Sequence, residues 1–199
     1  MKLKRMRVFL ALELPAPIRL QLLRIQEGLS FLGQGVKWVK KENMHLTLYF
    51  LGNLTPEKIQ GLSSCVQDVA SSLKPFTLEL GGLGHFPPRG KIRVLWAGIG
   101  AGSAELQALY TYLGEALGEF GFHIQRRAFT PHVTLGRLGS PRSIGYRLRA
   151  EEDMQREIVY GSFLVKEITL FQSILTPAGP IYKVVQRFAL LGKQVERRR

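Results

Sequence analysis

The sequence predicts an α+β protein made of two similar lobes, each with an antiparallel sheet, helices on the outer faces of the sheets and a cleft between the lobes. The first observation is that strand-like and helix-like segments alternate along the 199 residues. The second is that the strands are amphipathic and several connections are short enough for hairpins, which favours antiparallel sheets covered on one face. The third is that the order strand, helix, strand recurs about 87 residues later.

The first half of the chain supplies five expected segments. The helix after residue 54 carries the clearest signals, because Thr55 can cap it and Pro56 suits its first turn. The expected ranges, in order, are a buried strand at 7–14, an amphipathic helix at 15–32, one or two strands within 36–52, a helix at 54–75 and a strand at 76–86.

The second half begins the same order again. Its helix can be capped by Ser103, and its last two strands are expected to form a hairpin through the turn sequence TPAGP. The expected ranges are a strand at 92–100, a helix at 103–122, a strand at 129–139, an irregular and partly helical basic segment at 140–163, and strands at 164–175 and 182–192.

The repeated order indicates a duplicated unit. The stretch RVFLALEL begins at Arg7, and its counterpart RVLWAGIG begins at Arg93. The strand motif that begins at His45 returns at His132, which is 87 residues later. Strand, helix and motif therefore recur at nearly constant spacing, and we expect an approximate twofold axis between the two copies.

This pattern predicts a single bilobal domain, 1–199, with repeat units at about 7–85 and 93–190 and a basic, solvated tail at 193–199. The apolar run Val8–Leu12 is too short for the core of a signal peptide, and no segment reaches the length of a membrane span. We therefore expect a cytoplasmic protein. We also expect a monomer, because the twofold axis is already internal.

The chain is strongly basic. Its 28 Lys and Arg residues oppose 15 Asp and Glu residues, for a formal net charge of +13. Such an excess attracts polyanions, so nucleic acid, anionic membranes and phosphorylated small molecules are the candidate partners. The single cysteine, Cys65, excludes a disulfide framework and a thiol metal cluster.

Two copies of one strand motif, HLTLYFLG and HVTLGRLG, stand at matching places in the repeat. Residues i and i+2 of a strand share a face, so His45 points the same way as Thr47, and His132 the same way as Thr134. A single His-x-Thr strand most often holds a half-buried structural histidine. Two matching copies, however, favour a shared site in which both pairs converge across the cleft.

Two imidazoles and two hydroxyls around one small volume suit attack on a phosphodiester. A neutral histidine can take a proton from water while a protonated one gives a proton to the leaving oxygen. The threonine hydroxyls can donate hydrogen bonds to the non-bridging phosphate oxygens, and no metal is needed. Zinc is a weaker alternative, because zinc sites use three or four ligands and the remaining histidines, His85 and His123, have no matching spacing.

A further set of segments surrounds these motifs, namely RVFLALELP, FPPRGKIRVLWAGI, FTPHVTLGRL and LTPAGPIY. Together with the paired motifs, they resemble the two-histidine phosphoesterase superfamily and, within it, the LigT-like RNA 2′,3′-cyclic phosphodiesterases, first named 2′-5′ RNA ligases. The resemblance covers residues 6–192. It implies a bilobal fold and cofactor-free hydrolysis of a terminal 2′,3′-cyclic phosphate to a 2′-phosphate, with the reverse joining to a 5′-hydroxyl detectable.

The resemblance also implies a division of roles that the near-symmetric motifs leave open. It assigns His45 as the proton donor to the leaving 3′ oxygen and His132 as the proton acceptor that activates water. Thr47 and Thr134 match the threonines that hold the phosphate. The alternative to an enzyme is a binding module that holds RNA ends or nucleotides in the cleft without turning them over.

Arg137 matches an arginine that lies near the phosphate in relatives. Strict alternation places it on the opposite face from His132, unless the strand bulges near Gly136. Its inclusion among the phosphate-binding residues therefore depends on an irregular strand.

The remaining candidates are weaker. Arg126 and Arg127 are candidates for contact with an RNA backbone, and Phe9 and Tyr49 could stack on a base, although core packing is favoured for both aromatic residues. The expected partner is an RNA or oligonucleotide end with a 2′,3′-cyclic phosphate, because such ends have free bases and a 2′ oxygen to recognise. No membrane and no obligate protein partner are expected.

Overall fold

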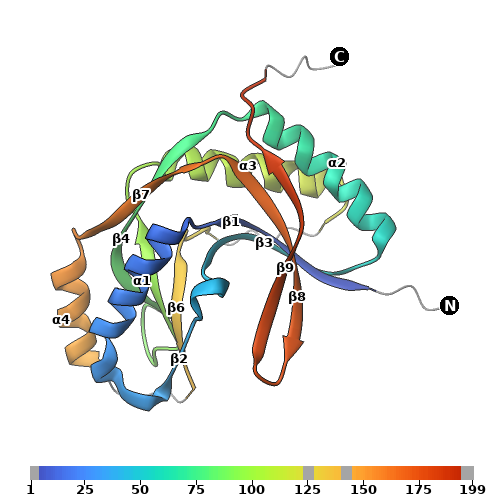
Figure 1. The fold of residues 1–199 in the computed structure, drawn as a ribbon. Helices are drawn as coiled ribbons and strands as arrows, with labels where there is room; N and C mark the ends of the chain where they lie inside the picture. The colour runs from blue at the N-terminus through green and yellow to red at the C-terminus, as the bar shows by residue number, and fades with distance from the viewer. Residues whose placement is uncertain (1–4, 123–127, 140–144, 194–199) are drawn as a thin grey trace.

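Nine strands, four α-helices and two short 3₁₀ helices make up the described part of the chain, residues 5–122, 128–139 and 145–193 of the computed structural model (Figure 1). The strands are β1 (Met6–Glu13), β2 (Val36–Trp38), β3 (His45–Leu54), β4 (Phe76–Phe86), β5 (Val94–Ile99), β6 (Val133–Leu138), β7 (Val159–Val165), β8 (Glu167–Thr176) and β9 (Gly179–Ala189). The helices are α1 (Ala16–Gly28), η1 (Ser30–Gly35), η2 (Lys41–Asn43), α2 (Pro56–Ser72), α3 (Ser103–Glu119) and α4 (Gly145–Gln155).

All strand pairs in the described sheet are antiparallel, and the α+β class is confirmed. The strands follow the order β7-β4-β5-β6-β3-β1-β8-β9, with β2 paired to β6. The two sheets expected from the sequence meet at one residue pair, Leu46 of β3 with Val133 of β6. They therefore form one continuous curled sheet with a lobe on each side of that pair.

Each lobe takes two strands from the other repeat unit. The first lobe contains β3, β1, β8 and β9, and the second contains β6, β5, β4 and β7, with β2 beside β6. Strand β4 belongs to the first unit by sequence but pairs with β5, whereas β8 belongs to the second unit but pairs with β1. A repeat unit in the sequence is therefore not the same set of strands as a lobe in space.

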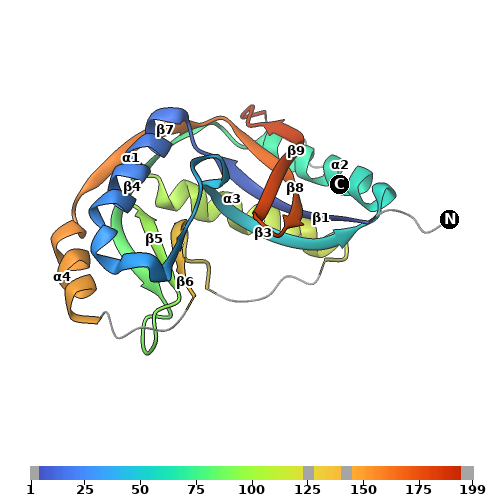
Figure 2. The same cartoon turned by 60° about the horizontal axis from the view of Figure 1, so that its bottom comes forward.

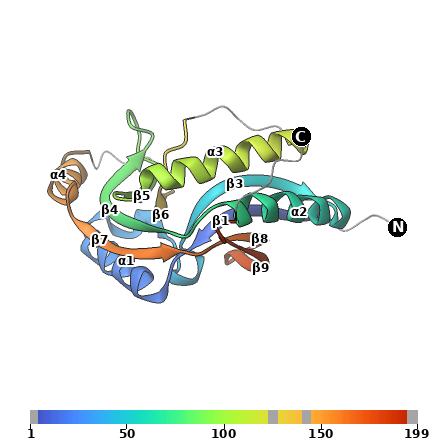
Figure 3. The same cartoon turned by 90° about the horizontal axis from the view of Figure 1, so that it is seen from above.

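The crossover helices also pack across the molecule. Helix α1 follows β1 but contacts β6 and β7 of the second lobe, and Gln26 donates hydrogen bonds from Nε2 to the carbonyl oxygens of Leu135 (2.8 Å) and Val39 (2.9 Å). Helix α3 follows β5 but bonds the first lobe, where the Tyr49 hydroxyl of β3 donates to the Tyr110 carbonyl at 2.8 Å. Figure 3 shows α2 and α3 together along one side of the sheet, away from α1.

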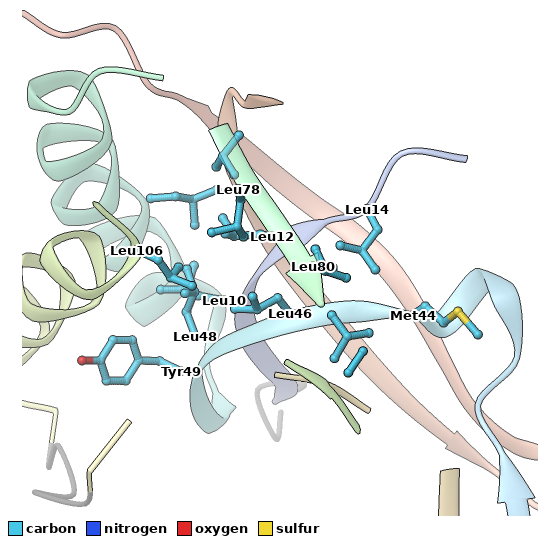
Figure 4. Close-up of a cluster of buried hydrophobic side chains, with 14 of the residues drawn as sticks. Leu10, Leu12, Leu14, Met44, Leu46, Leu48, Tyr49, Leu78, Leu80 and Leu106 are labelled. Atoms are coloured by element: carbon cyan, nitrogen blue, oxygen red, sulfur yellow. The ribbon is translucent and has the colours of Figure 1, made fainter. Parts of the chain in front are cut away.

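The main hydrophobic core lies between these helices and the sheet (Figure 4). Alternate residues of β1 enter it, namely Val8, Leu10 and Leu12. The residues between them do not face water, because Phe9 and Ala11 form a second small apolar cluster with Phe171 of β8. The sequence of β1 is continuously apolar because each of its two faces packs into an apolar cluster.

One strand was not expected from the sequence. Residues 140–163 were interpreted as irregular and partly helical; the helix is α4, but β7 begins inside this segment at Val159 and lies at the edge of the sheet. Its register is irregular between Val159 and Gly161, and Val159 and Leu164 are each about half exposed, so its apolar pattern does not alternate regularly. No helix in the described residues is long and apolar enough to cross a membrane.

Candidate active site

His45 stands at the first position of β3, and the turn before the strand fixes its ring. Its Nδ1 lies 2.7 Å from the carbonyl oxygen of Asn43. A carbonyl oxygen only accepts hydrogen bonds, so Nδ1 carries the proton. In the neutral ring, Nε2 therefore keeps the lone pair and is the nitrogen available for proton transfer.

His132 has the same local arrangement in the other lobe. Its Nδ1 lies 2.8 Å from the carbonyl oxygen of Thr130, again two residues upstream, and β6 begins at the next residue. The two histidines therefore share one tautomer. Each presents Nε2 as the atom that can take or give a proton.

The pairing of Leu46 with Val133 places the two histidines side by side at the starts of neighbouring strands. Both histidines line one cleft of about 740 Å³, a size typical of small-ligand sites. Thr47, Thr134 and Arg137 line the same cleft. The structure thus brings together all five residues that the sequence selected.

A bulge explains how Arg137 reaches this face. On β6, Thr134 pairs with Trp96 and Gly136 pairs with Leu95, so Leu135 is an extra residue in the strand. A Cβ on Gly136 would lie 2.7 Å from Cγ1 of Val36, so glycine allows the close approach of β2 there.

The same bulge occurs on β3. Thr47 pairs with Ala11 and Tyr49 with Leu10, so Leu48 is the extra residue. Tyr49, a candidate for base stacking, turns into the core, where it is 7% exposed and stacks on Tyr110 with ring centroids 4.4 Å apart. The next residue, Phe50, faces the cleft and is 73% exposed.

The cleft is electropositive. Among the lining residues that the structure describes, four carry positive charge and none is acidic. The basic residues are Arg7, Lys37, Lys40 and Arg137. Such a surface attracts phosphate groups.

Aromatic rings surround the two histidines. The His45 ring centroid lies 4.9 Å from that of Phe9 and 5.1 Å from that of Tyr182, which meets it edge-on. The His132 ring lies 4.9 Å from Phe86, also edge-on, and 6.2 Å from Trp96. These rings cover part of each imidazole.

Burial lowers the pKa of both histidines. For His45, loss of hydration is the largest cause, and the nearby His132 and Arg137 add to it, lowering the pKa from 6.5 to about 4. For His132, burial and then Arg137 lower the pKa. Both imidazoles are therefore largely neutral at pH 7 when the cleft holds no anion.

The turn before His45 is tied to a distant hairpin. Asn43 Nδ2 donates a hydrogen bond to the carbonyl oxygen of Pro180, at 2.9 Å, in the tip of the β8–β9 hairpin. Figure 2 shows this hairpin beside the segment that leads into β3. The same hairpin carries Tyr182, so it contacts His45 both directly and through Asn43.

The other sequence candidates are buried at the cleft wall, lie away from the cleft or fall outside the described residues. His85 does not line the cleft; its Nδ1 lies 2.6 Å from a carboxylate oxygen of Glu152 in α4. Phe9 lines the cleft but is only 2% exposed, with its ring centroid 4.9 Å from that of His45, so it offers little of its face to a base. His123, Arg126 and Arg127 fall outside the described residues. Within the described ranges, no group of three or more His, Cys, Asp or Glu residues could hold a metal ion.

Several lining residues were missed by the sequence reasoning. Phe50 was missed because nothing in LTLYF signals a bulge. The others come from segments far from the motifs, and the general basic excess did not single them out; they are Arg7, Lys37, Trp38, Lys40 and Tyr182.

Comparison with known proteins shows where this fold and site occur. The family model described as LigT like Phosphoesterase matches residues 12–96 and 99–182. A protein of Methanocaldococcus jannaschii named RNA 2′,3′-cyclic phosphodiesterase is 34% identical over 185 residues, which are 92% of this chain and 100% of that relative.

Solved structures agree with the sequence match. The crystal structure of TT0787 of Thermus thermophilus has a TM-score of 0.80 at 28% identity and covers 95% of this chain and 100% of its own. Escherichia coli LigT complexed with 3′-AMP has a TM-score of 0.76 at 28% identity, covering 94% of this chain and 98% of its own.

Proposed function

This chain belongs to the LigT-like phosphoesterase family, and we propose that it is an RNA 2′,3′-cyclic phosphodiesterase that converts a terminal 2′,3′-cyclic phosphate to a 2′-phosphate. One observation carries the proposal. Two histidines on adjoining strands each donate Nδ1–H to a backbone carbonyl, and both line one basic cleft. Two Nε2 atoms are therefore available for one acid and one base.

The reaction follows from that pair. The oxygen of a water molecule attacks phosphorus while Nε2 of His132 takes one of its protons. The bond from phosphorus to the 3′ oxygen breaks, and Nε2 of His45 gives its proton to that oxygen. The products are a 2′-phosphate and a 3′-hydroxyl, with His132 protonated and His45 neutral until both exchange protons with solvent.

The other three residues are proposed to hold the phosphate. Hydroxyls of Thr47 and Thr134 lie on the cleft side of the two strands, where they can donate to non-bridging oxygens. Arg137 supplies a fixed positive charge beside them. These contacts favour the transition state because charge on the non-bridging oxygens must be held during attack.

Binding of the phosphate also explains how His45, the proton donor, becomes protonated. The pKa of His45, about 4 in the free cleft, leaves little of the protonated form at pH 7. A negative charge placed beside the ring favours the imidazolium and raises its pKa. Substrate binding therefore prepares His45 as an acid.

The direct test uses an oligonucleotide that ends in a 2′,3′-cyclic phosphate, with separation of the 2′- and 3′-phosphate products. We expect the 2′-phosphate, formed without added metal and in the presence of chelator. Tight binding with unchanged substrate would instead indicate a binding module. Adding a second oligonucleotide with a 5′-hydroxyl tests the reverse joining reaction.

The proposal also covers the localisation and the oligomeric state of the enzyme. We expect it to act in the cytoplasm, as a monomer and without an obligate protein partner. The internal arrangement of two lobes around one cleft supports the monomer, because both histidines come from one chain. Light scattering of the purified protein at assay concentrations tests this point.

A further inference from the structure

Two positively charged side chains stand directly opposite each other in the second lobe. Lys37 of β2 pairs with Arg137 of β6, and both residues line the cleft. Opposite residues of antiparallel strands have Cβ atoms about 4.5–5.5 Å apart, and like charges in that position destabilise a sheet. Both side chains are exposed, and within the described ranges neither forms an ion pair. An anion in the cleft would therefore relieve a repulsion that the strand register creates.

The two charges lie at different distances from the histidines. The charge of Arg137 lowers the pKa of both His45 and His132. Lys37 is not among the charges that lower either pKa, although it lines the same cleft. Lys37 therefore lies farther from the imidazoles than Arg137 does. A phosphate held by the histidines and Arg137 leaves Lys37 available for a second anion.

A second lysine extends this basic wall of the cleft. Lys40 lines the cleft three residues after Lys37 and is also exposed. The hairpin tip, residues 177–180, lines the cleft too but carries no charge. The remaining positive charge among the described lining residues is Arg7, which pairs with Asn53 at the opposite end of β3 from His45. The cations beside the catalytic end of the cleft are therefore concentrated on the segment that follows β2.

We propose that Lys37 and Lys40 bind the phosphodiester on the 5′ side of the terminal nucleotide of the RNA. This inference rests on the proposed function and adds a second phosphate site to it. An RNA end carries this group one nucleotide away from the reacting phosphorus, whereas a mononucleoside cyclic phosphate lacks it. The flexible ammonium group of lysine contacts the backbone without reading the base. The site therefore favours an RNA end over a mononucleotide, whatever the terminal base.

The test compares two dinucleotides that both end in a 2′,3′-cyclic phosphate. One has an ordinary phosphodiester between its two nucleosides, and the other has an uncharged methylphosphonate at that position. The unaltered enzyme should have the higher kcat/KM with the charged linkage. Lys37→Gln and Lys40→Gln should each reduce this preference about two- to fivefold, the range of a solvent-exposed ion pair, and the double variant should reduce it further.

Lys37→Arg should keep the preference for the charged linkage, because it keeps the positive charge. Lys41→Gln is the matched control, since Lys41 directly follows Lys40 but does not line the cleft. It should leave the preference unchanged. A preference that survives the double variant overturns the proposal. Loss of the preference in Arg7→Gln but not in Lys37→Gln also overturns it, because the preceding phosphate would then lie at the other end of β3.

Calorimetry separates this inference from the proposed function. Binding of the two matching dinucleotides that end in a 2′-phosphate is measured for the unaltered protein and for the double variant. Loss of affinity in the double variant for the phosphodiester ligand alone supports the second phosphate site even if neither cyclic substrate is hydrolysed. Equal affinity of the unaltered protein for the two linkages overturns it, whatever the activity.

Discussion

The two lobes use the same backbone bulge to present different side chains. Three residues after each threonine, the first lobe places Phe50 in the cleft and the second lobe places Arg137. The histidines and threonines are the same in both lobes. The two lobes therefore share the histidine and threonine pair and the strand geometry, while the residue beyond each bulge gives one lobe an aromatic surface and the other a positive charge.

The lobes also differ in what holds each histidine. The turn before His45 is tied by Asn43 to the tip of the β8–β9 hairpin. The matching residue before His132 is Thr130, whose side chain is exposed and, in the part of the chain that the structure describes, bonds to no other element. The turn that holds His45 is therefore anchored to a distant segment, whereas the described residues show no such anchor for the turn before His132.

The largest expected effect comes from removing either histidine. His45→Ala and His132→Ala should each lower turnover by about 10²- to 10⁴-fold, because each removes one proton transfer. A substrate with sulfur in place of the bridging 3′ oxygen separates the roles, since a thiolate leaves without a proton. This substrate should rescue His45→Ala and not His132→Ala; the opposite pattern would reverse the assigned roles.

The pH dependence of the reaction tests whether bound phosphate raises the pKa values of His45 and His132. In the free protein the pKa of each histidine is below 6.5, and that of His45 is about 4, so the optimum of kcat/KM should lie below pH 6.5. Above it, kcat/KM should fall about tenfold per pH unit, because the proton donor loses its proton. The optimum of kcat should lie at higher pH, since bound phosphate raises the pKa of each ring. Coincident optima for the two parameters would contradict this view.

Arg137→Ala should lower kcat/KM about 10- to 100-fold, since a hydrogen bond to a charged group contributes about 1.5–3 kcal/mol. The loss should be equal for base-bearing and base-free cyclic phosphates. Equal losses on the two substrates would show that Arg137 acts on the phosphate and not on the base. Arg137→Lys should recover part of the activity; a loss confined to base-bearing substrates would place Arg137 on the nucleoside instead.

A smaller effect is expected at Asn43. Asn43→Ala keeps the backbone carbonyl but removes the bond to Pro180, and a small displacement of His45 should lower kcat about tenfold. The pKa of His45 should rise toward 6.5 as water gains access, which NMR of the ring nitrogens can follow. The charged or titratable groups that influence it are His132, which immediately precedes β6, and Arg137 of β6.

Glu42→Ala, in the same turn but outside the cleft lining, is the control for Asn43→Ala. It should leave both kcat and the titration of His45 as they are. Loss of thermal stability in Asn43→Ala, with the titration of His45 unchanged, would mean that the link to the hairpin serves folding alone.

The smallest expected effect concerns the hydrogen bond between β3 of the first lobe and α3. Tyr49→Phe removes the hydrogen bond to the Tyr110 carbonyl and should lower the free energy of unfolding by about 1 kcal/mol. Urea unfolding measures the change. Activity should be retained, because Tyr49 faces the core; a fall in kcat with little loss of stability would show that α3 controls the cleft.

Much of this arrangement was predictable from local sequence. Periodicity located the helices and most strands, and the two His-x-Thr copies selected the residues that meet in the cleft. Gly136 gave a reason to consider a bulge before Arg137. No glycine marks the equivalent bulge at Leu48, so alternation pointed to Tyr49 instead of Phe50. A bulge set by pairing with a neighbouring strand leaves little trace in the strand itself.

The features that sequence reasoning could not reach are those that join distant segments. The exchange of β4 and β8 between the lobes depends on which strands pair, and similar amphipathic patterns suit several pairings. The bond from Asn43 to Pro180 joins residues 137 positions apart. Such contacts come from the packing of the whole sheet, not from a local motif.

Strand exchange has a consequence for how the enzyme is made. During synthesis, both histidines and both bulged strands leave the ribosome before β8 and β9, which supply Phe171, Tyr182 and the acceptor for Asn43. A nascent or truncated chain that stops before Glu167 carries every proposed catalytic residue but lacks one wall of its cleft. The cleft is therefore complete only after β8 and β9 have been synthesised and β8 has paired with β1.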